Sequence, residues 1–202
     1  MGVDQAALTD AELIEASERD PTLFGEIAER HFVEIHGYIA RRVGRHLAED
    51  LGAETFAIAF ESRQRYDCTR TDARPWLFGI ATNLIRRHRR DEVRKLSAYT
   101  RAAHATAGAA ADPDFTVDQL DRLSRLADVA ARFGQLDPDH RDALYLVAVS
   151  ELSYQQAADA LGVPVGTIHS RVARARRALR DLTHISGQVE ESTPTPANER
   201  QR

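Results

Sequence analysis

Apolar residues recur at helical spacing along most of this 202-residue chain. No window combines apolar–polar alternation over a strand length with a high content of β-branched residues, so the sequence predicts no strands. Three pairs have the spacing of a capping box at a helix start: Thr9 with Glu12, Thr116 with Gln119, and Ser153 with Gln156. The helical spacing and the repeated helix starts predict an all-α fold.

Residues 100–116 divide the helical pattern in two. This stretch has small side chains, one Gly and one Pro, and no apolar periodicity, which is typical of a flexible linker. Residues 1–99 have the pattern of a bundle of about four helices, and residues 117–185 that of a second helical domain. Residues 186–202 have almost no apolar content and predict a disordered tail. We therefore expect two small all-α domains joined by a flexible linker.

The charges of the chain are segregated, although its formal net charge of −4 at first argues against a nucleic-acid partner. Residues 86–101 carry seven basic and two acidic side chains, and residues 168–180 carry five arginines and no acid. Residues 1–30 and 112–142 are acidic, with eight acidic side chains in each. Two compact cationic segments on an acidic chain are typical of a protein that binds a polyanion.

The second basic segment lies in a helix–turn–helix pattern. Gly162 fits the left-handed position of a tight turn after a helix. The apolar stripe of the following helix consists of Ile168, Val172, Ala175 and Leu179, spaced i, i+4, i+7 and i+11. That spacing leaves six polar side chains on the outer face: Thr167, His169, Ser170, Arg171, Arg174 and Arg177. Such a helix can enter the major groove and read bases, so these residues are candidates for contact with duplex DNA.

Three segments, in this order, resemble the extracytoplasmic-function sigma factors of bacterial RNA polymerase. EDLGAETFAIAF at 49–60 resembles the helix that grips the clamp helices of the polymerase β′ subunit. ARPWLFGIATNLIRRHRR at 73–90 is similar to the segment that melts and reads the promoter −10 element. LSYQQAADALGVPVGTIHSRVARAR at 152–176 is similar to the helix–turn–helix for the −35 element. The resemblance covers roughly residues 10–183 and implies a four-helix promoter-melting domain followed by a helix–turn–helix domain.

The resemblance also implies roles for individual residues. It assigns contact with core polymerase to Asp50, Leu51 and Glu54. The candidates for the −10 element are Arg74, Trp76, Asn83, Arg86, Arg87 and Arg90. From Asn83, steps of three and four lead to the last three arginines, so these four can share one helix face as a cationic track for unpaired bases. Trp76 is either a stacking platform for a base or a core residue, and its apolar neighbours favour the core.

The partners implied by the resemblance are core RNA polymerase, through the β′ clamp helices and the β flap, and promoter DNA, with an anti-sigma factor as a further candidate. The sequence departs from the family pattern at three positions. Ala53 stands where the family often has Gln, Gln156 where it has Glu, and His169 where a basic residue is common. We expect the first to affect one polymerase contact and the last to affect −35 preference.

Other classes of protein fit less well. The eight histidines form no HExxH-type ligand set and no glycine-rich phosphate loop occurs, so we expect neither an enzyme nor a cofactor or metal. Cys68 is the only cysteine, which excludes an intramolecular disulfide. No apolar stretch reaches membrane-spanning length and no secretory signal is visible, so we expect a cytoplasmic protein without membrane insertion. The main alternative is a helix–turn–helix regulator that does not act as a sigma subunit, which leaves residues 49–90 unexplained.

Overall fold

The computed structural model describes residues 8–102 and 135–189, and all regular elements in these two ranges are helical. The first range contains α1 (Asp10–Ala16), η2 (Pro21–Leu23), α2 (Phe24–Val43), α3 (Arg45–Ser62), η3 (Arg63–Arg65) and α4 (Arg74–Ala102). The second contains α6 (Pro138–Ala148), α7 (Tyr154–Leu161) and α8 (Val165–Val189). The expected all-α fold is confirmed, and the helix expected from Thr116 lies outside the described residues.

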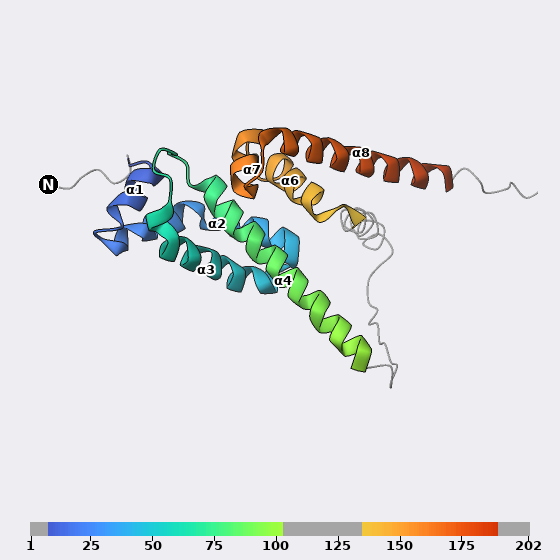
Figure 1. Ribbon diagram of the computed structural model, residues 1–202, viewed down its shortest axis with the longest axis horizontal. Coiled ribbons are helices and arrows are strands. Elements are labelled where there is room, and N and C mark those ends of the chain that lie inside the picture. The colour runs from blue at the N-terminus through green and yellow to red at the C-terminus, as the bar shows by residue number, and fades with distance from the viewer. Residues whose placement is uncertain (1–7, 103–134, 190–202) are drawn as a thin grey trace, which may run out of the picture.

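Helices α1–α4 pack as one bundle (Figure 1). The capping box of Thr9 with Glu12 is present and starts α1. Gly44, at a φ of 85°, separates α2 from α3 and lets the two helices lie side by side. The fully buried side chains on α2 and α4 form the centre of this core: Ile27, Ile35, Tyr38, Ile39, Leu77, Phe78 and Ile85.

Helices α6–α8 form the predicted helix–turn–helix domain. Asp137 accepts hydrogen bonds from the backbone amides of residues 139 and 140 and so caps α6. A capping box of Ser153 with Gln156 starts α7, and Gly162 ends it in the left-handed conformation, with φ 63° and ψ 36°. Three residues of the predicted apolar stripe on α8 are buried: Ile168, Val172 and Ala175.

The helix–turn–helix domain packs directly on the N-terminal bundle, with α7 against α4 (Figure 1). Gly79 of α4 makes this approach feasible, because a Cβ atom there would lie 2.6 Å from the backbone oxygen of Ala160 in α7. Any side chain at position 79 would therefore force the two helices apart.

Two helices extend past the boundaries expected from the sequence. Helix α4 continues to Ala102, beyond residue 99, and α8 continues to Val189, beyond residue 186. Neither extension contains a proline, so nothing in the local sequence interrupts backbone hydrogen bonding there. None of the helices in the described ranges is both long and apolar enough to cross a membrane.

Candidate nucleic-acid interface

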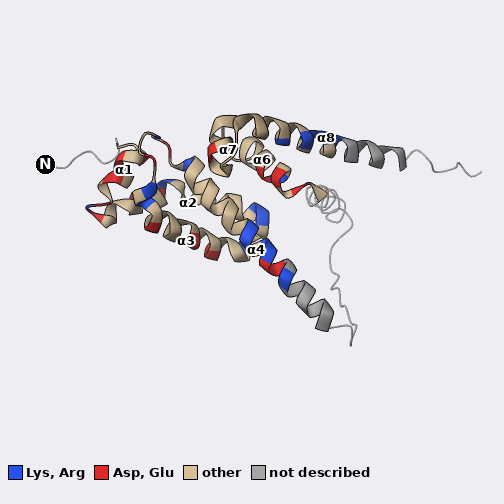
Figure 2. Ribbon diagram, in the orientation of Figure 1, with Lys and Arg blue, Asp and Glu red and all other residues tan. Residues whose placement is uncertain are grey.

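The basic half of α4 presents four of the candidate residues for the −10 element together. Asn83, Arg86, Arg87 and Arg90 line one cavity of about 410 Å³, with Ile58, Ile80 and Leu84 completing its wall. The preceding part of α4 is buried in the bundle, which holds this basic half in a fixed direction. Figure 2 shows Lys and Arg gathered on α4 past its midpoint and along α8.

Arg74 and Trp76 lie at the start of α4 and do not line that cavity. The Arg74 guanidinium donates from Nε to Glu34 Oε2 at 2.9 Å and from Nη2 to the backbone oxygen of Ser150 at 2.9 Å. The hydrogen bond to Glu34 raises the pKa of Arg74. Trp76 is half-buried, and its ring centroid lies 5.0 Å from that of Tyr66. Both rings line a separate cavity of about 250 Å³, so Trp76 packs on the bundle and also faces an open site.

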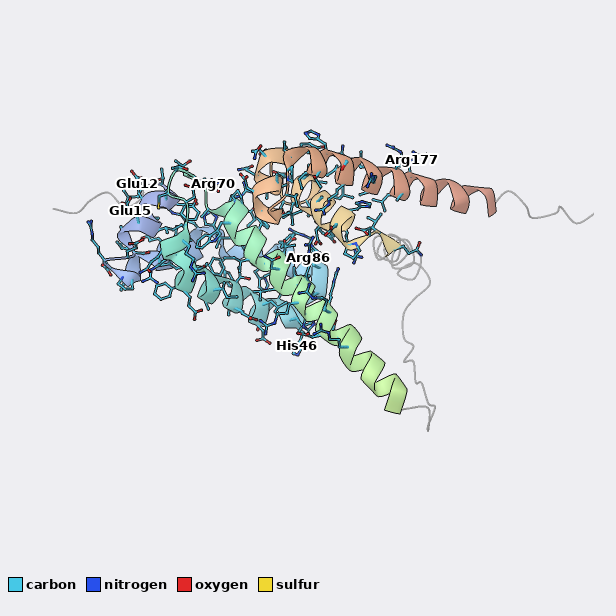
Figure 3. All side chains as sticks on the ribbon, in the orientation of Figure 1. Glu12, Glu15, His46, Arg70, Arg86 and Arg177 are labelled. Atoms are coloured by element: carbon cyan, nitrogen blue, oxygen red, sulfur yellow. The ribbon has the colours of Figure 1, made fainter. Side chains whose placement is uncertain are left out.

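The outer face of α8, the predicted recognition helix, is exposed to solvent over most of its length. His169, Ser170, Arg174 and Arg177 are exposed, while Thr167 and Arg171 are half-buried. Figure 3 labels Arg177 on the outer side of α8. The His169 ring stacks on Tyr154 of α7 with a centroid distance of 4.1 Å and an interplanar angle of 5°. Sequence reasoning missed Tyr154, since its partner is 15 residues away on another helix.

The candidate polymerase contacts on α3 divide into exposed and buried residues. Asp50 and Glu54 are exposed one helical turn apart. Leu51 is only 8% exposed and belongs to the core, so it can support a polymerase contact only from beneath its exposed neighbours, and the contact itself stays a prediction for all three residues. Glu54 Oε1 also lies 3.7 Å from Arg87 Nη1, which brings the acidic face of α3 next to the basic face of α4.

The loop ahead of α4 is anchored by a buried carboxylate. Asp10 Oδ2 lies 2.7 Å from His31 Nε2 and accepts a hydrogen bond of 3.0 Å from the Ala73 amide. Its Oδ1 accepts from Arg30 Nη1 at 3.2 Å. Burial opposes ionisation of Asp10, but these hydrogen bonds outweigh it and lower the pKa of the carboxyl. Asp10 thus fixes the residue from which α4 starts.

The two ranges that carry these surfaces match known protein families. Residues 27–95 match Sigma-70 region 2, and residues 126–179 match Sigma-70 region 4. The ECF RNA polymerase sigma factor SigC of Mycobacterium tuberculosis is 40% identical over 136 residues, which are 65% of this chain and 68% of that protein. The chain belongs to the extracytoplasmic-function sigma factors. It is therefore an RNA polymerase sigma factor, which binds core polymerase and directs promoter recognition.

Other relatives agree with this assignment of the sigma factor. The RNA polymerase sigma factor CarQ of Myxococcus xanthus is 34% identical over 160 residues, covering 79% of this chain and 88% of its own. Among solved structures, CnrH in complex with the cytosolic domain of CnrY has a TM-score of 0.58 at 24% identity. That match covers 91% of this chain and 99% of the other, so the two share a fold.

Sequence reasoning missed the acidic groups that pair with the sigma factor's arginines. Asp139 and Asp142 of α6 contact arginines of both domains, and the buried Arg42 of α2 pairs with Asp142. Arg42 and Asp142 are separated by 100 residues, so no local pattern could have paired them.

Proposed function

We propose that this sigma factor docks on the β′ clamp helices through the exposed acidic face of α3 and opens the −10 element with the basic half of α4. In the same proposal, α8 reads the −35 duplex. The observation that carries it is the convergence of Asn83, Arg86, Arg87 and Arg90 on one cavity next to that acidic face. The protein itself is not a catalyst, and it works in the cytoplasm, where core polymerase and the genome are found.

Strand opening follows from the chemistry of the basic half of α4. The arginines attract backbone phosphates, and their flat guanidinium groups can stack on unpaired bases. Asn83 can donate to and accept from a base edge, as purine and pyrimidine edges require. The cavity beside Trp76 and Tyr66 offers aromatic walls for an additional extruded base.

Recognition of the −35 duplex follows from the outer face of α8. Arg174 and Arg171 can bind guanine O6 and N7 with two hydrogen bonds, while Ser170 and Thr167 reach bases or phosphates. His169, held flat on Tyr154, presents its ring edge at a fixed orientation. The helix–turn–helix domain also contacts the β flap of polymerase in this proposal.

An anti-sigma factor is proposed as a further partner. The solved complex of the sigma factor RpoE with the anti-sigma factor NepR from Bartonella quintana has a TM-score of 0.55 and 24% identity with this chain. This similarity in fold supports an anti-sigma factor as a partner of this chain. Co-purification from the native cell would identify that anti-sigma factor.

Transcription by core polymerase tests the proposed function directly. Purified core enzyme plus this protein is incubated with genomic DNA, and the 5′ ends of the transcripts are sequenced. We expect start sites downstream of a shared pair of motifs. A protein that binds promoter duplex but never programs core polymerase would instead be a helix–turn–helix regulator.

Replacing Arg174 with alanine should weaken binding to the −35 duplex by about 1–3 kcal/mol, as expected for the loss of a base contact. Fluorescence anisotropy with the promoter duplex identified above measures the loss. Arg176→Ala is the matched control, because Arg176 is exposed on α8 but lies about 200° around the helix from Arg174. If both variants lost the same affinity for the duplex, binding would depend on the net charge of α8 and not on a base contact by Arg174.

Asn83→Ala and Arg87→Ala should impair strand opening while leaving −35 duplex binding nearly intact. A charge-assisted hydrogen bond contributes about 1.5–3 kcal/mol. We therefore expect Arg87→Ala to reduce the amount of open complex by about tenfold or more. Permanganate footprinting of unpaired thymines in the polymerase–promoter complex measures it. Unchanged opening in both variants would show that α4 does not hold the melted strand.

A further inference from the structure

The cavity between the N-terminal bundle and α6 is lined mainly by charged side chains. Its volume of about 550 Å³ is within the usual range of small-molecule sites. The arginines that line it come from α2, α4 and α6: Arg42, Arg86, Arg89, Arg90, Arg94 and Arg141. Asp139 and Asp142 of α6 are the acidic residues among its described lining. Six positive charges against two negative ones leave this lining with a net charge of +4. Figure 3 labels Arg86 where α4 and α6 approach each other.

The two aspartates cannot neutralise the remaining arginines, because all four of their carboxylate oxygens already accept hydrogen bonds. Asp142 accepts from Arg42 Nη2 with one oxygen and from Arg86 Nε with the other, the latter at 2.5 Å. Asp139 accepts from Arg86 Nη2 at 2.7 Å with its first oxygen. Its second oxygen accepts from Arg171, which does not line the cavity. The excess positive charge of the cavity therefore lies on its other arginines.

This excess charge is concentrated where three helices meet. Arg89 of α4 is half-buried, and its Nη2 donates to the neutral backbone oxygen of Arg42 at 2.9 Å instead of to a carboxylate. Burial lowers the pKa of the Arg89 guanidinium, and the positive charges of Arg42 and Arg141 lower it further. Arg141 is also half-buried, and its Nη2 donates to the backbone oxygen of Leu136 at 2.8 Å. An anion between these arginines would relieve their mutual repulsion.

The chemistry of the lining selects the kind of anion. A guanidinium group can donate two parallel hydrogen bonds to a phosphate group, and several such groups together favour a ligand with more than one negative charge. We propose that this cavity binds a small anion with two or more phosphate groups, held between Arg89 of the bundle and Arg141 of α6. This inference goes beyond the promoter-binding function and does not depend on it.

Burial of the lining favours a small anion over a nucleic-acid strand. A strand binds along an open groove, whereas the Arg42 side chain is 1% exposed and Arg89 and Arg141 are half-buried. Asn83 and Arg87, the exposed candidates for the −10 strand, line the neighbouring cavity and not this one. The cavity against α6 is therefore a separate site from the one assigned to unpaired bases.

Two variants of the full chain test the site, one on each side of the cavity. Arg89→Gln removes one charge on α4, and Arg141→Gln removes one charge on α6. Both variants leave Arg86 and Arg90 in place, since these two also line the cavity assigned to the −10 strand. Arg176→Gln is the matched control, because it removes the same charge from an exposed position on α8 outside the cavity. Far-ultraviolet circular dichroism verifies that each variant is folded.

Isothermal titration calorimetry with inorganic tripolyphosphate, at constant ionic strength, measures the affinity of each protein. We expect the wild type and Arg176→Gln to bind alike, and Arg89→Gln and Arg141→Gln to bind about tenfold more weakly or worse. Orthophosphate, with a single phosphate group, should bind the wild type about tenfold more weakly than tripolyphosphate. ATP in a parallel titration distinguishes two sources of the same chemistry. Tighter binding than tripolyphosphate would assign the site to a nucleotide, and equal or weaker binding to the phosphate groups alone.

The inference would be overturned if the wild type did not bind tripolyphosphate, which is a test that holds even if a variant fails to fold. Equal losses of affinity in Arg89→Gln, Arg141→Gln and Arg176→Gln would also overturn it, because binding would then follow net charge alone.

A short single DNA strand of random sequence tests the alternative occupant. We expect Arg141→Gln to keep its affinity for the strand within about twofold of the wild type while it loses affinity for tripolyphosphate. If the variant lost both affinities alike, the cavity would belong to the DNA surface and the inference would fail. Transcript sequencing with core polymerase tests the proposed function separately, so the two failures are distinguishable.

Discussion

Phe78→Ala lowers the free energy of unfolding of the N-terminal bundle by about 3–5 kcal/mol, the usual cost of truncating a buried phenylalanine. Phe78 is fully buried on α4, and its ring meets Tyr38 edge to face with the centroids 5.0 Å apart. The loss has two parts: the transfer free energy of the ring, and the free-energy cost of the cavity that the missing ring leaves behind. Urea denaturation followed by far-ultraviolet circular dichroism measures it.

Phe32→Ala is the matched control for that variant. Phe32 lies on α2 and is 44% exposed, so its truncation leaves no enclosed cavity. We expect a loss of about 1 kcal/mol or less. If both phenylalanine variants lost the same stability, the core of this bundle would not be centred on Phe78.

Asp10→Ala is expected to lower the free energy of unfolding by about 3 kcal/mol at neutral pH. The substitution leaves the buried His31 and the Ala73 amide without their acceptor. The start of α4 loses its anchor as well, so strand opening should decline together with stability. Glu29→Ala, which removes an exposed carboxylate from α2, is the control and should change stability by less than about 0.5 kcal/mol.

The pH dependence separates the charge of Asp10 from its packing. Its pKa is lower in the folded protein than the ordinary value near 4, so the unfolded chain binds more protons in acid. The stabilisation from ionised Asp10 is therefore complete above about pH 4 to 5 and declines as the pH falls through the folded pKa. The difference in unfolding free energy between wild type and Asp10→Ala should shrink below about pH 4. A difference that stays constant down to pH 2 would contradict this explanation.

Features that depend on neighbouring residues could be predicted from the sequence. The capping boxes at Thr9 and Ser153 and the left-handed Gly162 involve groups within four or five residues of one another. Backbone geometry alone brings such groups together. The same is true of the one-faced cluster from Asn83 to Arg90, which follows from helical spacing once α4 is recognised as a helix.

Exposure and long-range pairing could not be predicted in the same way. The resemblance assigns Asp50, Leu51 and Glu54 to one polymerase contact alike, whereas the packing of α3 on α2 and α4 buries Leu51 and leaves the other two exposed. Trp76 has the apolar neighbours of a core residue and still lines a cavity, and one residue of that cavity's wall, Asp159, comes from the other domain.

The sequence by itself determined the helical elements, the two basic segments and the family, since these depend on local spacing and on the order of motifs. Only the tertiary structure decided which arginines are held by aspartates. Arg42 and Asp142 meet where the helix–turn–helix domain packs on the bundle, and that packing buries both charges, so they must pair. Such a pairing depends on the relative placement of two domains, which no spacing along the chain encodes.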